Sequence, residues 1–417
     1  MDILKRGCSG SNLCRFTKIF QRACFSVLAH KGWLRSGDSV VRLRRPNSAD
    51  ISAVAWTASR TRFDLIWRMC HSSSVELERK GGTALPVAVT KRLNGLLEDV
   101  RQVMEAKEFE KLNSMTQYCF LEGGKLLRPK IVLLMAGATH LASHSSVEAP
   151  LCKCPSSQDI LDSQYKIALI SEMIHTASLV HDDVIDESDE RRGRPTMHRL
   201  GGNKAAILVG DYILAKATQL LTSIGNADVI RLLSQVIEDL VKGEFMQLGS
   251  RDSEDERFAH YMAKTFKKTA SLFAHSCKAV SLLADCSSSL NESAFQYGRH
   301  LGIAFQLIDD ALDFIAQASV LGKPAAADLR LGIATAPVLF AARQNPMLTE
   351  LILRRFSRPG DVQLAWELVL HSDGVEQTKK LAEMHSQEAV RHAECFPDCD
   401  YKRELINTAF LQTSREK

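Results

Sequence analysis

The sequence predicts a single all-α domain built from many helices. From Val87 onward, apolar residues recur at helical spacing almost throughout, and strict alternation of apolar and polar residues is rarely sustained. Three long segments, at residues 160–180, 205–221 and 291–316, are strongly apolar. Helices of this kind pack into the core of a protein rather than lie on its surface. We therefore expect buried helices and few strands.

Several boundaries of these helices can be predicted from small and polar residues. Gly201-Gly202-Asn203 predicts a loop that ends in a helix N-cap, and Gly225 predicts the end of that helix. The helix between them is apolar on nearly every side, so we expect it to be buried. Residues 141–158 are rich in Ser, Pro and Cys and predict a connection without helical pattern.

The first 83 residues differ in composition from the rest. Residues 1–75 hold 13 Lys and Arg but only four acidic residues, whereas the remainder holds 40 basic and 45 acidic residues. A Ser- and Arg-rich, acid-poor segment is typical of an organelle-targeting peptide, although a basic disordered tail has a similar composition. We predict a mitochondrial (matrix) targeting leader and linker at 1–83, disordered in part, although a chloroplast transit peptide has the same composition. The body is not basic, which argues against nucleic-acid binding.

The cysteines and the hydropathy exclude other classes. Eleven cysteines without repeated spacing argue against a disulfide framework. Cys152 and Cys154 form a C-x-C pair, a poor zinc signature that favours a surface loop. No run approaches 18 uninterrupted apolar residues, so no transmembrane span is predicted.

The first candidate site is the aspartate-rich motif HDDVIDESDERRG at residues 181–193. In a helix, Asp182 and Asp186 lie one turn apart on one face, with Asp183 to the side. Such carboxylates at the end of an apolar helix require a cation, and oxygen-only ligands favour Mg²⁺ or Ca²⁺. Arg191 and Arg192 follow and offer phosphate-binding forks. A solvated acidic helix end is the alternative interpretation.

A second aspartate motif, FQLIDDALDFIA at residues 305–316, reduces the weight of that alternative. Asp309, Asp310 and Asp313 lie inside an apolar helix, where carboxylates are unfavourable unless they face a metal or a cavity. Gln306 lies one turn before Asp310. Two such helices that face each other would bind a polyanion through divalent metals.

A third element, EGGKLLRPK at residues 122–130, places Lys125 and Arg128 three residues apart near a helix start. This geometry favours anions, although ordinary surface charge explains it equally well.

Taken together, these motifs resemble the trans-isoprenyl diphosphate synthases, in particular the long-chain polyprenyl (decaprenyl and solanesyl) synthases of mitochondria. GGKLLRP, LVHDDVIDESDERRG, GDYILAKA, GEFMQL, KKTASLF, FQLIDDALDF and GKP occur in the family's order, from about residue 84 to the C-terminus. The resemblance implies an isoprenoid synthase bundle of helices around a central active-site cavity, with the catalytic domain at 84–417. It also implies elongation of an allylic diphosphate with isopentenyl diphosphate, for the ubiquinone side chain.

The resemblance further implies roles for individual residues. The Mg²⁺ ligands would be Asp182, Asp183, Asp186, Asp309, Asp310 and Asp313. The allylic diphosphate (farnesyl or geranylgeranyl) would contact Arg191, Lys268, Thr269, Gln306 and Lys323. Isopentenyl diphosphate would contact Lys125, Arg128, His175 and Arg192. The partner would be a second, non-identical synthase subunit, in a heteromer, or a second copy in a homodimer.

Product length depends on the residues one turn before Asp182. Ala177 and Ser178 are small, whereas family members with short products carry an aromatic residue there. Small residues imply an open tunnel and a long product.

One position departs from the family's pattern. After GKP the family's next motif, the DL segment, begins at Asp328 in this chain. Many relatives carry Lys five residues after the Asp of that segment, where this chain has Ile333. One phosphate contact is therefore lost or supplied elsewhere, with Arg330 as a candidate.

Two alternatives remain at this point: a class I terpene cyclase and a non-catalytic partner subunit. Cyclases replace aspartates of the second motif, and regulatory subunits lose aspartates from one motif, whereas both motifs are complete here.

Overall fold

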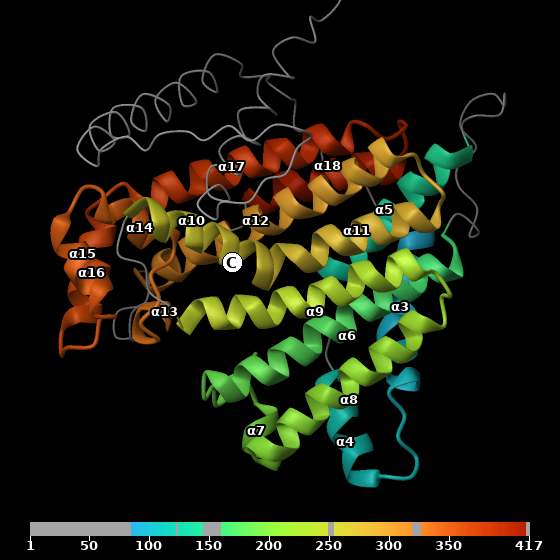
Figure 1. Ribbon diagram of the computed structural model, residues 1–417, viewed down its shortest axis with the longest axis horizontal. Helices are drawn as coiled ribbons and strands as arrows, with labels where there is room; N and C mark the ends of the chain where they lie inside the picture. The colour runs from blue at the N-terminus through green and yellow to red at the C-terminus, as the bar shows by residue number, and fades with distance from the viewer. Residues whose placement is uncertain (1–84, 122–123, 145–159, 249–253, 319–326, 414–417) are drawn as a thin grey trace, which may run out of the picture. The chain divides into compact units, whose positions relative to one another are not determined.

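The helices expected from the sequence are present in the computed structural model, which describes residues 85–121, 124–144, 160–248, 254–318 and 327–413 (Figure 1). In chain order they are α3 (Val87–Val103), α4 (Glu110–Cys119), α5 (Leu127–His144), α6 (Asp162–Ile185), α7 (Met197–Gly201), α8 (Asn203–Thr222), α9 (Ala227–Leu248), α10 (Glu254–Thr265), η1 (Phe266–Ala270), α11 (Ser271–Leu283), α12 (Ser288–Ala318), α13 (Ala327–Arg330), α14 (Ala336–Ala342), α15 (Pro346–Leu353), α16 (Asp361–Leu370), α17 (Gly374–Ala393) and α18 (Asp400–Thr413). Within the described residues, strands are confined to one two-residue hairpin, β1 (Glu190–Arg191) with β2 (Arg194–Pro195). The all-α prediction is confirmed.

The leader predicted at 1–83 and the Cys152–Cys154 pair lie outside the described residues. Both stay predictions.

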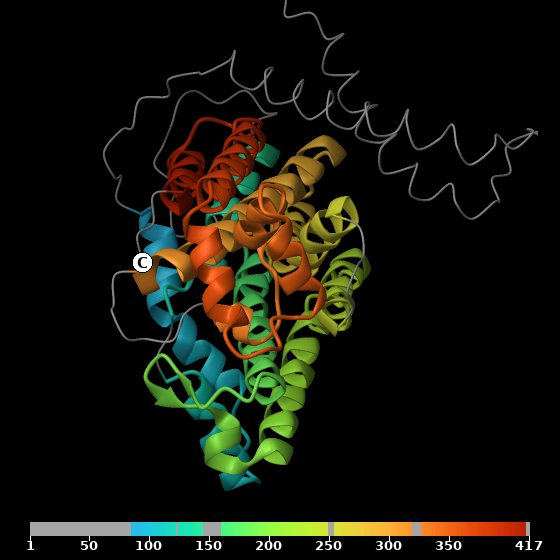
Figure 2. The ribbon, with the colours of Figure 1, turned by 90° about the vertical axis from the view of Figure 1, so that its left-hand side faces the viewer.

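The centre of the bundle consists of α6, α11 and α12. α6 packs against α5 and α8, while α12 lies between α11 and α17 (Figures 1 and 2). Most residues of α6 are buried, among them Ile167, Ile170 and Ile174, as its apolar sequence predicts. The first aspartate motif ends this central helix, so its carboxylates come out of the hydrophobic core.

Two glycines of α12 allow it to lie unusually close to the preceding helices. A Cβ at Gly298 would lie 2.5 Å from the carbonyl oxygen of Phe273. A Cβ at Gly302 would lie 2.6 Å from the Cα of Ala270. This close approach brings the second aspartate motif of α12 next to the segment that carries Lys268 and Thr269.

That segment is the π-helical turn η1, Phe266–Ala270. One extra residue per turn changes the direction of the neighbouring side chains, and π-helical turns are frequent at functional sites. The wider turn lets Lys267 and Lys268 point to different partners.

The prediction that residues 205–221 form a buried helix is wrong for one face of α8. Ile207 is 44% exposed and Leu208 is 54% exposed, because α8 packs on α6 and leaves its outer face uncovered. Gly202, with φ of 80°, precedes the helix, so Asn203 is its first residue rather than its cap. In the described residues, α8 is the one helix whose length and composition would suit a membrane span, a weak indication for a helix packed on its neighbour.

Candidate active site

A cavity of about 410 Å³ lies between the C-terminal end of α6, the α10–η1 segment and α12. Its charged lining consists of five carboxylates (Asp182, Asp186, Asp309, Asp310 and Asp328) and five cationic side chains (Arg128, Arg191, Arg192, Lys264 and Lys268). Opposite charges in equal number suit a ligand that combines an anion with metal cations. This arrangement confirms that the two aspartate-rich helices face one cavity.

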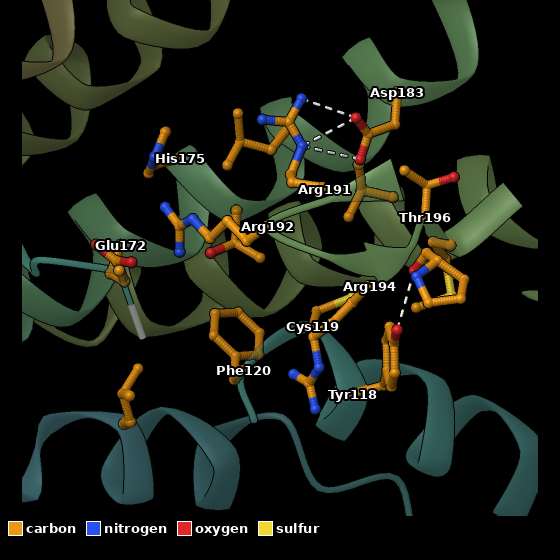
Figure 3. Close-up of a pocket in the computed structure, with 17 residues that line it drawn as sticks. Tyr118, Cys119, Phe120, Glu172, His175, Asp183, Arg191, Arg192, Arg194 and Thr196 are labelled. Atoms are coloured by element: carbon orange, nitrogen blue, oxygen red, sulfur yellow. Dashed lines mark hydrogen bonds and ion pairs between the residues drawn. The ribbon is translucent and has the colours of Figure 1, made fainter. Parts of the chain in front are cut away.

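In the first motif, Asp182 and Asp186 line the cavity but Asp183 does not. The Asp183 side chain is 4% exposed and faces Arg191. Arg191 Nε donates to both of its oxygens, at 2.9 and 3.1 Å, and Arg191 Nη2 lies 2.7 Å from Oδ1 (Figure 3). The carboxylate of Asp183 therefore orients Arg191, and in this arrangement it is not directed at the cavity.

In the second motif, Asp309 and Asp310 line the cavity, whereas Asp313 lies outside its lining. Asp310 is 4% exposed and accepts hydrogen bonds from Tyr261 Oη at 2.6 Å and Gln306 Nε2 at 2.8 Å. Thr269 Oγ1 donates to Gln306 Oε1 at 2.7 Å. This network fixes one wall of the cavity and ties the π-turn to the aspartate helix.

Burial and mutual repulsion raise the pKa values of several carboxylates of the cavity. Burial is the main cause that raises the pKa of Asp182 to about 6, and the charges of Glu244 and Asp186 add to it. Burial also raises the pKa of Asp310 to about 7, followed by repulsion from Asp328. Asp328 itself has a pKa raised to about 6 by burial and by Asp313. Oxygen ligands that share a poorly solvated site in this way fit a hard divalent cation, which would relieve their repulsion.

The lysines at positions 264, 267 and 268 have three different environments. Lys267 Nζ bonds to Asp239 at 2.6 Å and lies outside the cavity lining. Lys268 lines the cavity, with Nζ 2.5 Å from Glu244 Oε1 and 3.1 Å from Gln247 Oε1. Lys264 also lines the cavity. The run is therefore not a solvated helix face.

A cationic wall lies where α5 meets α6. Arg128 stacks over Phe273 at 4.9 Å, and burial lowers its pKa to about 10. His175 and Arg192 line both the large cavity and a smaller neighbour of about 120 Å³. Figure 3 shows the Arg192 side chain directed toward His175 and Glu172. Burial, followed by Arg128 and Arg192, lowers the pKa of His175 well below its usual value, so the ring is neutral at pH 7.

Gly124 makes room for this wall. A Cβ at Gly124 would lie 2.5 Å from Nη2 of Arg192. The glycine of the GGK segment thus permits a close approach of the guanidinium.

The remaining predicted site residues have mixed outcomes. Lys125 is exposed and lies outside the described cavities, and Lys323 lies outside the described residues. Ser178 lines the large cavity, whereas Ala177 is fully buried in the core.

Several cavity residues were not predicted from the sequence. Asp328 belongs to the DL segment, so its motif could have identified it. Glu244, which pairs with Lys268 beside the cavity, belongs to GEFMQL and could have been found in the same way. Tyr261 and Lys264 carry no signal of their own, because only the packing of α10 brings them to the site.

Comparisons with known proteins agree with this geometry. Residues 109–369 match the family model described as polyprenyl synthetase. Human all-trans-polyprenyl-diphosphate synthase is 50% identical over 325 residues, which is 78% of this chain and 75% of that protein. Decaprenyl-diphosphate synthase subunit 1 of Schizosaccharomyces pombe is 39% identical over 79% of this chain and 90% of its own length.

Solved structures resemble the chain as well. The polyprenyl synthase of Caulobacter crescentus, complexed with calcium and isoprenyl diphosphate, matches with a TM-score of 0.68 and 30% identity over 82% of this chain and all of that one. The decaprenyl diphosphate synthase of Rhodobacter capsulatus has the same TM-score at 28% identity, over 79% of this chain and 98% of that one.

Proposed function

The chain belongs to the polyprenyl synthetase family and is a trans-polyprenyl diphosphate synthase, and we propose that it uses Mg²⁺ to add isopentenyl units to farnesyl or geranylgeranyl diphosphate. The product would be a long all-trans polyprenyl diphosphate for the ubiquinone side chain. The observation that supports this most is the cavity in which Asp182 and Asp186 face Asp309 and Asp310.

Those four carboxylates would hold the metal. Bound Mg²⁺ supplies positive charge that neutralises the diphosphate and favours its departure. The chain's own Lys268, Thr269, Gln306 and Arg191 would bind the allylic diphosphate and hold its reacting carbon in place. The allylic carbon–oxygen bond would then break with diphosphate as the leaving group. The isopentenyl double bond would attack the allylic cation, and the proton that is lost would pass to the released diphosphate.

The isopentenyl diphosphate would occupy the cationic wall of Arg128, His175 and Arg192. A neutral His175 would donate a hydrogen bond to the phosphate without adding a full charge. Asp183 would act through Arg191, whose guanidinium it holds beside the cavity.

The activity is tested with the purified chain, Mg²⁺, radiolabelled isopentenyl diphosphate and either allylic primer. Chromatography of the products should show chains longer than about 20 carbons, because small residues precede Asp182 and leave room for a growing tail. Absence of any labelled prenyl product, both alone and with a second synthase subunit, would contradict the proposal.

The second subunit would cover the apolar surface of α8 and α9. Ile207 and Leu208 on α8, and Val241 and Phe245 on α9, are exposed, Phe245 to 71%. Large exposed apolar side chains on neighbouring helices are typical of an obligate interface. A relative is named subunit 1 of its enzyme, which favours a non-identical second subunit over a second copy.

Light scattering after size-exclusion chromatography tests this assembly. Co-expression with the candidate subunit should give a heteromer, and Phe245→Asp should dissociate it. Matched Leu353→Asp, at another exposed position, should have no effect. A homodimer formed by the chain alone would contradict the heteromer.

We also propose that the enzyme acts in the mitochondrial matrix. Relatives from Neurospora crassa and Yarrowia lipolytica are named as mitochondrial or probable mitochondrial enzymes, and residues 1–83 have the composition of a targeting leader. A fluorescent protein fused after residue 83 should enter mitochondria. Retention of that fusion in the cytosol would contradict the localisation.

A further inference from the structure

Lys264 reaches the active-site cavity from α10 and forms no ion pair with any other described residue. In the part of the chain that the structure describes, no hydrogen bond or salt bridge joins Lys264 to another residue. Its Nζ lies 6.0 Å from the centre of the Tyr261 ring. Lys267 and Lys268, by contrast, each have a carboxylate within 2.6 Å. Lys264 is therefore the member of this group that is left to bind a ligand.

The nearest carboxylates do not neutralise it. Asp310 lies close enough to influence Lys264, but its two oxygens accept hydrogen bonds from Tyr261 and Gln306. Asp328 and Glu244 are the other carboxylates that act on Lys264, and Lys268 is a nearby cation. Burial lowers the pKa of Lys264, which shows that the ammonium lacks the solvation of a surface lysine. An anion bound in the cavity would give the Lys264 ammonium the ion-pair partner that these neighbours do not provide.

Lys264 and Ile333 share a location. Both line the large cavity, and both line an adjacent cavity of about 90 Å³. Ile333 lies in the segment between α13 and α14, where its backbone N–H donates to Asp328 O at 2.9 Å. Gly332, with φ of 75°, precedes it and provides the turn. A charged side chain at position 333 would thus enter the same space that Lys264 reaches from the opposite element.

We propose that Lys264 binds the diphosphate of the allylic substrate and takes the place of a cation that this chain lacks at position 333. This inference rests on the proposed function of the cavity. It explains why Ile333 is compatible with activity without any contribution from Arg330, which is exposed and lies outside the cavity lining.

The ammonium would act as a point charge on the side of the cavity formed by α10 and α12, opposite the guanidinium groups of Arg191 and Arg192. A diphosphate between them would contact cations on two sides. Loss of Lys264 should therefore weaken diphosphate binding more than it changes the rate of bond formation once substrate is bound.

The test compares Lys264→Met, the double variant Lys264→Met/Ile333→Lys and the control Lys278→Met. Lys278 lies on α11, outside the cavity lining, and its Nζ is 3.4 Å from Oε2 of the exposed Glu292. Calorimetric titration of the full chain with inorganic diphosphate in Mg²⁺ measures binding without turnover. Steady-state kinetics then give KM for the allylic primer, and thermal melting checks that every variant is folded.

Lys264→Met should weaken diphosphate binding and raise KM for the primer at least tenfold, with a smaller change in kcat. The double variant should return both values to within threefold of the wild type, and the control should not differ. Binding by Lys264→Met within twofold of the wild type would overturn the inference. So would a weakened single variant that Ile333→Lys does not rescue.

The two hypotheses fail in different ways. If the wild-type chain binds diphosphate but elongates no primer with any partner, the proposed function is wrong. The titration then still tests whether Lys264 contributes to diphosphate binding. If the wild-type chain does not bind diphosphate in Mg²⁺, both are wrong.

Discussion

Asp183 is held by the guanidinium of Arg191, with Nη2 2.7 Å from its Oδ1, although its two neighbours in the motif, Asp182 and Asp186, face the cavity. We infer that these adjacent aspartates have different tasks. Asp182 and Asp186 would bind a metal, and Asp183 would orient the guanidinium of Arg191.

Replacement of the two kinds of aspartate should have distinguishable effects. Asp182→Ala should lower kcat at least about 100-fold, as expected for the loss of a group that stabilises charge in the transition state. Asp183→Asn should instead raise KM for the primer by roughly tenfold, because a buried charge-assisted bond to Arg191 is weakened. Magnesium titrations of the activity check the difference: the Mg²⁺ requirement should rise for Asp182→Ala only. An equal shift for Asp183→Asn would place that residue among the metal ligands.

The crowded carboxylates should make the metal-free protein less stable at neutral pH. The folded-state pKa of Asp182 is raised to about 6. Protonation of Asp182 therefore contributes to the stability of the fold. This contribution is fully present below about pH 4, near the pKa of Asp in the unfolded chain, and is lost as the pH rises through 6. In the absence of metal at pH 8, the free energy of unfolding of Asp182→Asn should exceed that of the wild type by about 1–2 kcal/mol. The variant should therefore unfold at a higher temperature. The gain should disappear at pH 4, and a gain of equal size at both values would contradict this account.

Metal binding should follow the same titration. Because the ligands bind Mg²⁺ only when deprotonated, affinity should fall as the pH drops below about 7, the value to which the pKa of Asp310 is raised. Calorimetry with Mg²⁺ at pH 8 and pH 6 measures this directly. Equal affinity at the two values would show that these carboxylates are not the ligands.

A histidine pair outside the cavity lining should control stability at acidic pH. His300 Nδ1 and His385 Nδ1 lie 2.8 Å apart where α12 packs on α17, and His392 stacks on His300. Burial, followed by neighbouring cationic groups, lowers the pKa of His300 to about 2, and burial and Arg299 lower that of His385 to about 4. Both pKa values in the folded protein are below the value in the unfolded chain. The stability that the neutral rings contribute is therefore present above pH 6.5 and is lost as the pH falls toward 4.

His385→Gln should reduce that loss, since glutamine keeps a polar side chain but does not gain a proton. Between pH 7 and pH 5 the unfolding temperature of the variant should fall less than that of the wild type, by about 2–4 °C. Parallel decreases in the two proteins would indicate that the pair does not titrate in this range.

Product length tests the small residues before the first motif. Ser178 lines the cavity, so Ser178→Phe should block the growing chain and shorten the product. Ala177→Phe should do the same, although Ala177 is buried and the larger ring also requires some repacking. Chromatography of the dephosphorylated products measures the length. Unchanged length in both variants would contradict a tunnel along this part of α6.

The sequence predicted the helices and the cavity because both follow from local patterns. Apolar spacing identified α6 and α12, and the cost of burying Asp309 and Asp310 indicated that they face a site. Helical spacing placed Asp183 to the side of Asp182 and Asp186, but it did not show that a later arginine would hold the Asp183 carboxylate. The burial of α8 was mispredicted for a related reason: apolar composition does not show whether a helix face packs on the protein's own core or lies at its surface.

The position of Lys264 at the cavity could not be predicted from the sequence either. In the sequence it is one of three neighbouring lysines, and only the π-helical turn after it separates their directions. Long-range packing of α9, α10 and α12 then decides which lysine meets a carboxylate and which meets the cavity.

The central claim is that the two aspartate helices bind divalent metal and diphosphate between them. Crystals of the protein with Mn²⁺ and inorganic diphosphate, measured at the manganese absorption edge, test it directly. Anomalous peaks should lie beside Asp182 and Asp186 on one wall and beside Asp309 and Asp310 on the other, with diphosphate between them and Asp183 still on Arg191. Peaks at Asp183, or a cavity without metal while diphosphate is bound, would contradict this account.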